Sequence, residues 1–200
     1  MKLLKNQKNS IINKDYMNEP NPQLIKDFSE AEKLSKEKKY QESINKYEII
    51  LKKYPNFLPA INNIGLAYEY LGLLDKSIYY YKLCCDKTPK EKIFLNNLGN
   101  IYYKKKDYIN AIKTFELSYN IDNRQELITE KLANSLVQAN FRKQAETFLR
   151  RILKTFPNNS FLNTLMGNNL LALSCYKEGL DFLKKGTGFI ELNNDSVSII

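Results

Sequence analysis

The chain has 200 residues, a formal net charge of +9 and 43% hydrophobic residues, which is enough apolar material for a folded core. It contains no histidine, which excludes His-based acid–base catalysis, His metal ligands and the usual Ser and Cys catalytic triads. Its three cysteines are Cys84, Cys85 and Cys175, which form neither a disulfide framework nor a metal-binding spacing. Without histidine and without such a cysteine set, we expect that the chain is not an enzyme and binds no metal and no cofactor.

Residues 1–20 mix Lys and Asn with the apolar pairs Leu3-Leu4 and Ile11-Ile12, and no period persists. This pattern predicts a flexible N-terminal arm. The arm lacks the apolar core of a signal peptide, and nowhere does the chain have an apolar run long enough for a membrane span. Together with the sparse cysteines, this predicts a cytoplasmic, reduced protein with no membrane partner.

The first helix is predicted to begin at Asn21-Pro22, with Asn as the cap and Pro at the first helical position. From there the sequence repeats itself at a step of 34 residues without an inserted residue. Four columns keep this step: Ala31, Gly65, Gly99, Ala133 and Gly167; Ser43, Ser77, Ala111, Ala145 and Gly179; Tyr47, Tyr81, Phe115, Leu149 and Leu183; Pro55, Pro89, Asn123 and Pro157.

Each copy is predicted to form two antiparallel helices. In the second copy, apolar residues at helical spacing begin at Ile61, and a second such stripe begins at Leu74 after a turn at Gly72. The small residues Gly65 and Ser77 let the two backbones approach closely, and a bulky aromatic residue fills the space beside them. One helix pair cannot bury both of its faces, so neighbouring copies must stack.

The predicted stack covers residues 21–186, and its copies are 24–57, 58–91, 92–125, 126–159 and 160–193. The first copy carries Asp27 and Glu30 where the second has isoleucines, as expected for an exposed end of the stack. The fifth copy is weakened by Gly179 and Gly186, so its second helix is predicted to end near Lys185-Gly186.

Residues 187–200 form an apolar tail. Two short extended segments are predicted, Phe189–Leu192 and Val197–Ile200, on either side of Asn193–Asp195. Because a lone two-stranded hairpin is marginal in water, the tail is expected to cover the end of the stack or to pair with another chain.

The repeat resembles the tetratricopeptide repeat (TPR), a helix–turn–helix unit of the same length. The third copy carries the resemblance through Leu95, Leu98-Gly99, Tyr102, Tyr108, Ala111 and Phe115. Asn123 replaces the usual Pro, and the first apolar position has no Trp. The resemblance implies an all-α, right-handed superhelical solenoid of about five units, an α-α superhelix whose first helices line a concave groove.

The same resemblance places one set of residues on the inner face of that groove: Phe28, Glu32, Asn62, Asn63, Leu66, Glu69, Asn96, Asn97, Asn100, Tyr103, Glu130, Lys131, Asn134, Val137, Thr164, Asn168 and Leu171. Asparagine dominates the centre of this set. A primary amide has two donors and an acceptor, so it can bind the backbone of an extended peptide. The candidate peptide-binding residues are therefore Asn62, Asn63, Asn96, Asn97, Asn100, Tyr103, Lys131, Asn134 and Asn168.

The sequence therefore predicts a non-catalytic scaffold that binds a protein or peptide partner. Family members that clamp the acidic C-terminus of chaperones use a Lys and Asn set over three successive copies, which this chain lacks; copy four, for example, has Glu130. Two alternatives remain: the recruiting arm of a multidomain or multi-subunit enzyme, and a nucleic-acid binder that uses the basic edge. Nucleic acid is the less expected partner, because Lys and Asn are abundant everywhere and no recognised motif is present.

Overall fold

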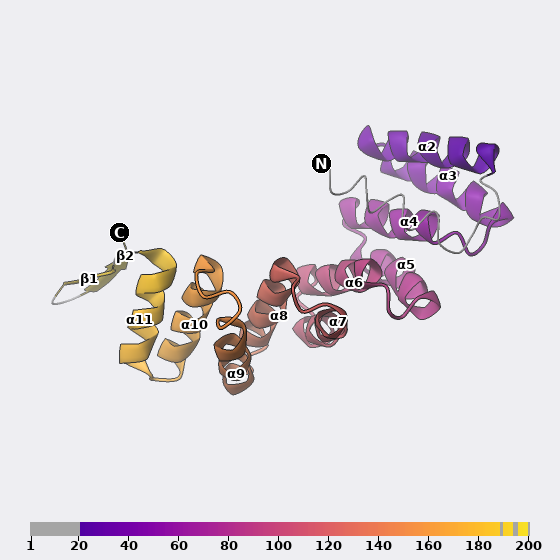
Figure 1. Ribbon diagram of the computed structural model, residues 1–200. Coiled ribbons are helices and arrows are strands. Elements are labelled where there is room, and N and C mark those ends of the chain that lie inside the picture. The colour runs from indigo at the N-terminus through magenta and orange to yellow at the C-terminus, as the bar shows by residue number, and fades with distance from the viewer. Residues whose placement is uncertain (1–20, 189, 194–195, 200) are drawn as a thin grey trace. The chain divides into compact units, whose positions relative to one another are not determined.

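The computed structural model describes residues 21–188, 190–193 and 196–199 (Figure 1). Between residues 22 and 187 this described chain forms ten helices, as the repeat predicts. They are α2 (Pro22–Lys36), α3 (Tyr40–Lys53), α4 (Leu58–Tyr70), α5 (Leu74–Lys87), α6 (Lys92–Lys104), α7 (Tyr108–Ile121), α8 (Glu126–Gln138), α9 (Arg142–Ile152), α10 (Ser160–Ala172) and α11 (Tyr176–Thr187). None of the described helices combines the length and apolar character that crossing a bilayer requires.

Along the chain, a first helix (α2, α4, α6, α8 or α10) alternates with the second helix that follows it, and the two helices contact one another in α2–α3, α4–α5, α8–α9 and α10–α11. The predicted cap of the first pair is confirmed, because the Asn21 side chain accepts hydrogen bonds from the backbone of Gln23 and Leu24. The chain divides into two compact units, one ending at Ile101 and the other beginning at Tyr102, so the division falls within α6.

A left-handed residue follows the first helix of every pair. These residues are Lys38, Gly72, Lys106, Asn140 and Ser174, with φ between 62° and 74°, and each lies 34 positions after the last. At Gly72, its own N–H donates to Glu69 O (3.1 Å) and the next N–H donates to Tyr68 O (2.9 Å). The other four turns repeat both bonds. This is a Schellman motif, which satisfies the last carbonyls of the first helix and reverses the chain.

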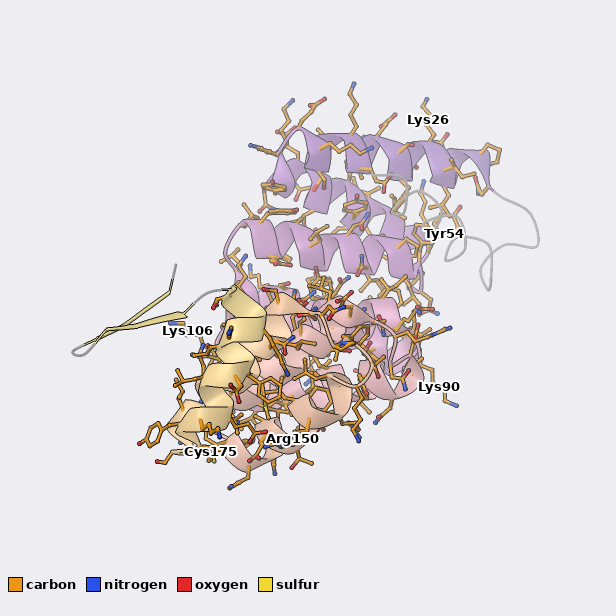
Figure 2. All side chains as sticks on the ribbon, turned by 60° about the vertical axis from the view of Figure 1, so that its left-hand side comes forward. Lys26, Tyr54, Lys90, Lys106, Arg150 and Cys175 are labelled. Carbon is orange, nitrogen blue, oxygen red and sulfur yellow. The ribbon has the colours of Figure 1, made fainter. Side chains whose placement is uncertain are left out.

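Only one of these five turns has glycine, the residue that adopts positive φ without a steric cost. We therefore expect Lys106→Gly to raise the free energy of unfolding by about 0.5–1 kcal/mol. Figure 2 labels Lys106, whose side chain is exposed and forms no hydrogen bond or ion pair with another described residue. Urea unfolding followed by circular dichroism measures the effect.

Lys113→Gly is the matched control, because Lys113 is an exposed lysine within the neighbouring helix α7. Glycine inside a helix costs about 1 kcal/mol, so this variant should lose stability. If both substitutions destabilise the chain equally, Lys106 does not adopt the left-handed conformation.

The repeat columns explain how the two helices of a pair pack. All fifteen residues of the first three columns are buried, from Ala31 to Leu183. In the second copy, a Cβ on Gly65 would lie 3.0 Å from the ring of Tyr81, so the predicted contact between a small residue and a bulky aromatic one is confirmed. The pairs touch where the side chains are smallest, and the third column fills the remaining space.

The core of the first unit joins α2, α3 and α4. Phe28 is 8% exposed, and its ring packs against Tyr47 (centroids 5.6 Å apart) and Phe57 (5.3 Å). A second cluster in this unit places Leu58 and Ile61 against Cys84 and Phe94. Cys84 is a small core residue that is fully buried.

The second unit has one continuous core, which extends from Ala111 on α7 to Leu170 on α10. Its successive second helices are also linked at the surface. The Arg150 guanidinium donates to Glu146 of its own helix (3.0 Å) and to both carboxylate oxygens of Glu178 on α11 (2.6 and 2.8 Å). The hydrogen bond from Arg150 lowers the pKa of the Glu178 carboxyl.

The C-terminal segment forms the two predicted extended pieces as an antiparallel pair. Strand β1 (Ile190–Asn193) pairs with β2 (Ser196–Ile199), and Ile190 lies opposite Ile199. Helix α11 ends at Thr187, close to the expected position. The predicted arm, residues 1–20, lies outside the described residues, as do Phe189 and Ile200 of the predicted strands.

Candidate functional site

The candidate peptide-binding residues lie on first helices of both units, and the members within each unit are called its asparagine face below. Eight are half-buried and Asn168 is exposed. In the first unit the face consists of Asn62, Asn63, Asn96, Asn97 and Asn100, and in the second unit of Tyr103, Lys131, Asn134 and Asn168.

In the first unit, the amides form a chain of hydrogen bonds across three helices. Asn97 Nδ2 on α6 donates to Asn62 Oδ1 on α4 (2.8 Å), and Asn62 Nδ2 donates to Asn63 Oδ1 (3.4 Å). Asn63 Nδ2 in turn donates to the hydroxyl of Tyr47 on α3 (3.0 Å). Burial raises the pKa of Tyr47 to about 12, so its hydroxyl stays protonated near neutral pH. The amides are thereby held in fixed orientations.

In the second unit, a tyrosine takes part in the same kind of contact. Asn134 Nδ2 on α8 donates to the hydroxyl of Tyr103 (2.6 Å), and Asn134 Oδ1 accepts from Gln138 (3.4 Å). The Tyr103 ring also meets Tyr108 edge-on at 5.6 Å. Asn168 is exposed, whereas its neighbour Asn169 is buried and donates to Arg142 O (3.0 Å). Asn169 thus links α10 to the first turn of α9.

Two residues expected on the inner face are instead part of the core. Phe28 and Val137 are each 8% exposed, and both lie in the hydrophobic clusters of their units. Helical spacing places them near the edge of the face, where packing against the second helix covers them. That prediction was therefore wrong for these two residues.

A pocket of about 420 Å³ adjoins the asparagine face of the first unit. It is called the Tyr40–Tyr70 pocket below, and its walls are Glu32, Ser35, Lys36, Lys38, Tyr40, Tyr47, Asn63, Leu66 and Tyr70. The rings of Tyr40 and Tyr70 stack with centroids 5.0 Å apart and planes 9° apart. The sequence analysis missed this pocket. A comparison of Tyr70 with Lys36 and Lys104, one repeat away on each side, could have indicated it.

A second cavity, of about 490 Å³, lies in the second unit among α7, α8 and α9. Its lining includes Phe148 and Arg151, whose guanidinium lies 5.2 Å from the Phe148 ring centroid and 5.6 Å from that of Tyr119. Lys143 of this lining forms an ion pair with Glu146 (3.6 Å), so its charge is already neutralised within the protein. Among the described residues, no three Cys, Asp or Glu side chains gather as metal ligands would.

Comparison with known proteins agrees with this architecture. The sequence matches the family model described as tetratricopeptide repeat over residues 58–90 and 94–125. It is 25% identical over 105 residues to Hsp70-Hsp90 organizing protein 3 of Arabidopsis thaliana, and 20% identical over 133 residues to anaphase-promoting complex subunit 3 of Schizosaccharomyces pombe. These matches cover 52% and 66% of this chain, which spans only 19% and 20% of the two relatives.

Among solved structures, the chain is similar to MamA from Desulfovibrio magneticus RS-1. The TM-score is 0.74 over 83% of this chain and 94% of that one, at 11% sequence identity, so the likeness concerns the fold. Four observations agree on a helix–turn–helix repeat architecture: the repeat columns, the five Schellman turns, the family model and the relatives. They indicate a protein-interaction scaffold as the general role. Residues 58–90 and 94–125 are thus tetratricopeptide repeats, and the described helices on either side of them follow the same helix–turn–helix order.

Proposed function

We propose that the chain is a non-catalytic scaffold that binds an extended peptide segment of a partner protein along the asparagine face of the first unit. The observation that carries the proposal is the chain of hydrogen bonds from Asn97 through Asn62 and Asn63 to Tyr47. It orients three amides that are only half-buried.

Each of these amides keeps hydrogen-bonding capacity for a ligand. An asparagine Nδ2 has two protons, and each bond described above uses one of them. An extended peptide presents backbone N–H and C=O groups that lose water on binding and need partners. Amides already fixed by the protein lose little side-chain entropy when they bind, which favours affinity.

The proposal includes a reducing compartment such as the cytoplasm. All three cysteines are free thiols, and Cys84 lies in the core. Burial raises the pKa of the Cys84 thiol, so this residue stays protonated and unreactive. These features support the proposal, because oxidising compartments favour cysteines that are paired.

The test begins with a random peptide library displayed on phage and selected on the intact chain. The affinity of an enriched peptide is then measured by isothermal titration. We expect Asn63→Ala combined with Asn97→Ala to weaken binding by about 1–3 kcal/mol, because two net hydrogen bonds are lost. The double variant also loses its bonds to Tyr47 and Asn62, so circular dichroism must show that it remains folded.

Asn45→Ala combined with Asn56→Ala is the control, since both residues are exposed asparagines of the same unit outside the asparagine face. This variant should bind like the wild type. Equal affinity of all three proteins would show that the asparagine face is not the binding surface.

A further inference from the structure

The Tyr40–Tyr70 pocket has an apolar wall that is unusual for its place in the repeat. Tyr70 is 62% exposed and Leu66 is 38% exposed, one helical turn apart on α4. The next residues, Leu71 and Leu73, are exposed as well. A contiguous exposed apolar surface of this kind marks a binding site more often than it marks ordinary surface.

The other copies show what the fold itself requires at these positions. At the places of Leu66 and Tyr70, they carry Glu32 and Lys36, Asn100 and Lys104, Asn134 and Gln138, and Asn168 and Ala172. These residues are polar, charged or small, and a first helix forms with them in each of these copies. Packing within the repeat therefore does not account for the large apolar residues of copy two.

Positive charge borders this apolar wall. Lys36 and Lys38 both line the pocket and are exposed, and neither forms an ion pair with another described residue. Glu32 lies one helical turn before Lys36 in the same lining and has a partner of its own. Lys38 occupies a left-handed turn position with φ 62°, which fixes its backbone at the rim. The charge is complementary to carboxylates of a ligand.

We propose that the Tyr40–Tyr70 pocket binds a large apolar side chain of a partner peptide that has acidic residues beside it. The proposal rests on the proposed peptide-binding function and specifies the class of peptide. A volume of about 420 Å³ falls within the usual range of ligand pockets, about 300–1,000 Å³. Tyrosine supplies rigid contact area and is frequent among residues that dominate binding energy. Asn63 belongs to both surfaces, so a peptide on the asparagine face can reach the pocket.

The test uses the same displayed library on the intact chain and asks which residues are enriched. We expect Leu, Ile or Phe together with neighbouring Asp or Glu. An enriched peptide is then labelled with fluorescein and titrated by fluorescence anisotropy against three variants. Its affinity should also fall as ionic strength rises, because the lysines are exposed.

Leu66→Asn combined with Tyr70→Gln removes the apolar wall. The two new residues are those that copy four carries at these positions, so the repeat accepts both. This double variant should bind roughly tenfold more weakly or worse. The control is Tyr79→Thr, again the residue of copy four at its position; Tyr79 is 58% exposed on α5 and lies outside the pocket. This control should bind like the wild type. Lys36→Glu combined with Lys38→Glu should shift enrichment from acidic to basic neighbours.

The outcomes separate this inference from the proposed function. If the alanine changes at Asn63 and Asn97 abolish peptide binding but both pocket variants still bind, the asparagine face binds the peptide and the pocket inference is overturned. If both pocket variants abolish peptide binding but the alanine changes do not, the pocket inference stands and the proposed role of the asparagine face is overturned. If every variant binds the peptide as the wild type does, or if the library yields no enriched peptide, both proposals are overturned. A wild-type dimer that Leu66→Asn with Tyr70→Gln makes monomeric, measured by light scattering, would show that a second copy occupies the wall and would also overturn the inference.

Discussion

Gly167→Ala is expected to lower the free energy of unfolding of the second unit by about 1–3 kcal/mol, and Gly167→Leu by more. Gly167 is buried where α10 meets α11. A Cβ built there would lie 2.6 Å from Leu183 Cγ and 2.8 Å from the backbone oxygen of Gly179. The leucine can shift at some cost, but the oxygen belongs to a helix backbone. Relief therefore requires the two helices to separate.

Asn168 provides a control one residue away on the same helix. It is exposed, so Asn168→Ala and Asn168→Leu should each change stability by less than about 0.5 kcal/mol. Guanidinium unfolding of the four variants, followed by circular dichroism, gives the comparison. Equal midpoints for the Gly167 and Asn168 series would mean that α10 and α11 do not meet at Gly167.

Most of the helix packing could be predicted from the sequence, because side-chain size at the closest contact is a local property. Gly65, Ala133 and Gly179 are each small where two backbones meet, and each is buried. A residue of this kind recurs at a fixed step only if the same contact recurs. The 34-residue step therefore predicted the helix pairs within each unit.

The turns were harder to predict, since one glycine among five does not suggest a shared left-handed conformation. Lys38 and Lys106 adopt it although a lysine side chain makes it less favourable. The cost is about 1 kcal/mol for a single residue, which is small beside the burial that each helix pair gains. Tertiary packing sets the turn, and the residue at that position adapts to it.

The asparagine network depends on side-chain rotamers in three dimensions, which no spacing rule gives. Asn97 and Asn62 are 35 positions apart, so the repeat step places them near each other but does not show which amide donates. Tyr103 was expected on the inner face, but its position in the repeat does not show that its hydroxyl accepts a hydrogen bond from Asn134. Similarly, the repeat spacing does not show that Leu66 and Tyr70 of copy two line one pocket together with Tyr40 of copy one.

The first unit is expected to lose stability steeply in alkaline solution. Burial raises the pKa of Tyr47 to about 12 from an ordinary 10.0. Burial and the neighbouring Glu69 carboxylate, to which its hydroxyl donates at 3.5 Å, raise the pKa of Tyr81. Burial also raises the pKa values of the Cys84 and Cys85 thiols, the latter to about 12. Each group ionises in the unfolded chain at a pH where the folded chain keeps it neutral.

The sign follows from this difference, and Tyr47 isolates one contribution. Its share of the stability is complete below pH 10.0 and is lost as pH rises through about 12. The loss amounts to about 1 kcal/mol by about pH 11 and about 2 kcal/mol by about pH 12.

Tyr47→Phe should lower the free energy of unfolding by about 0.5–1.5 kcal/mol near neutral pH, because Asn63 loses its acceptor. Its urea midpoint should then fall less than that of the wild type between about pH 9 and 11. The control Tyr79→Phe changes an exposed tyrosine of the same unit and should follow the wild-type curve. If Tyr47→Phe falls as steeply as the wild type, its ionisation does not contribute to alkaline unfolding.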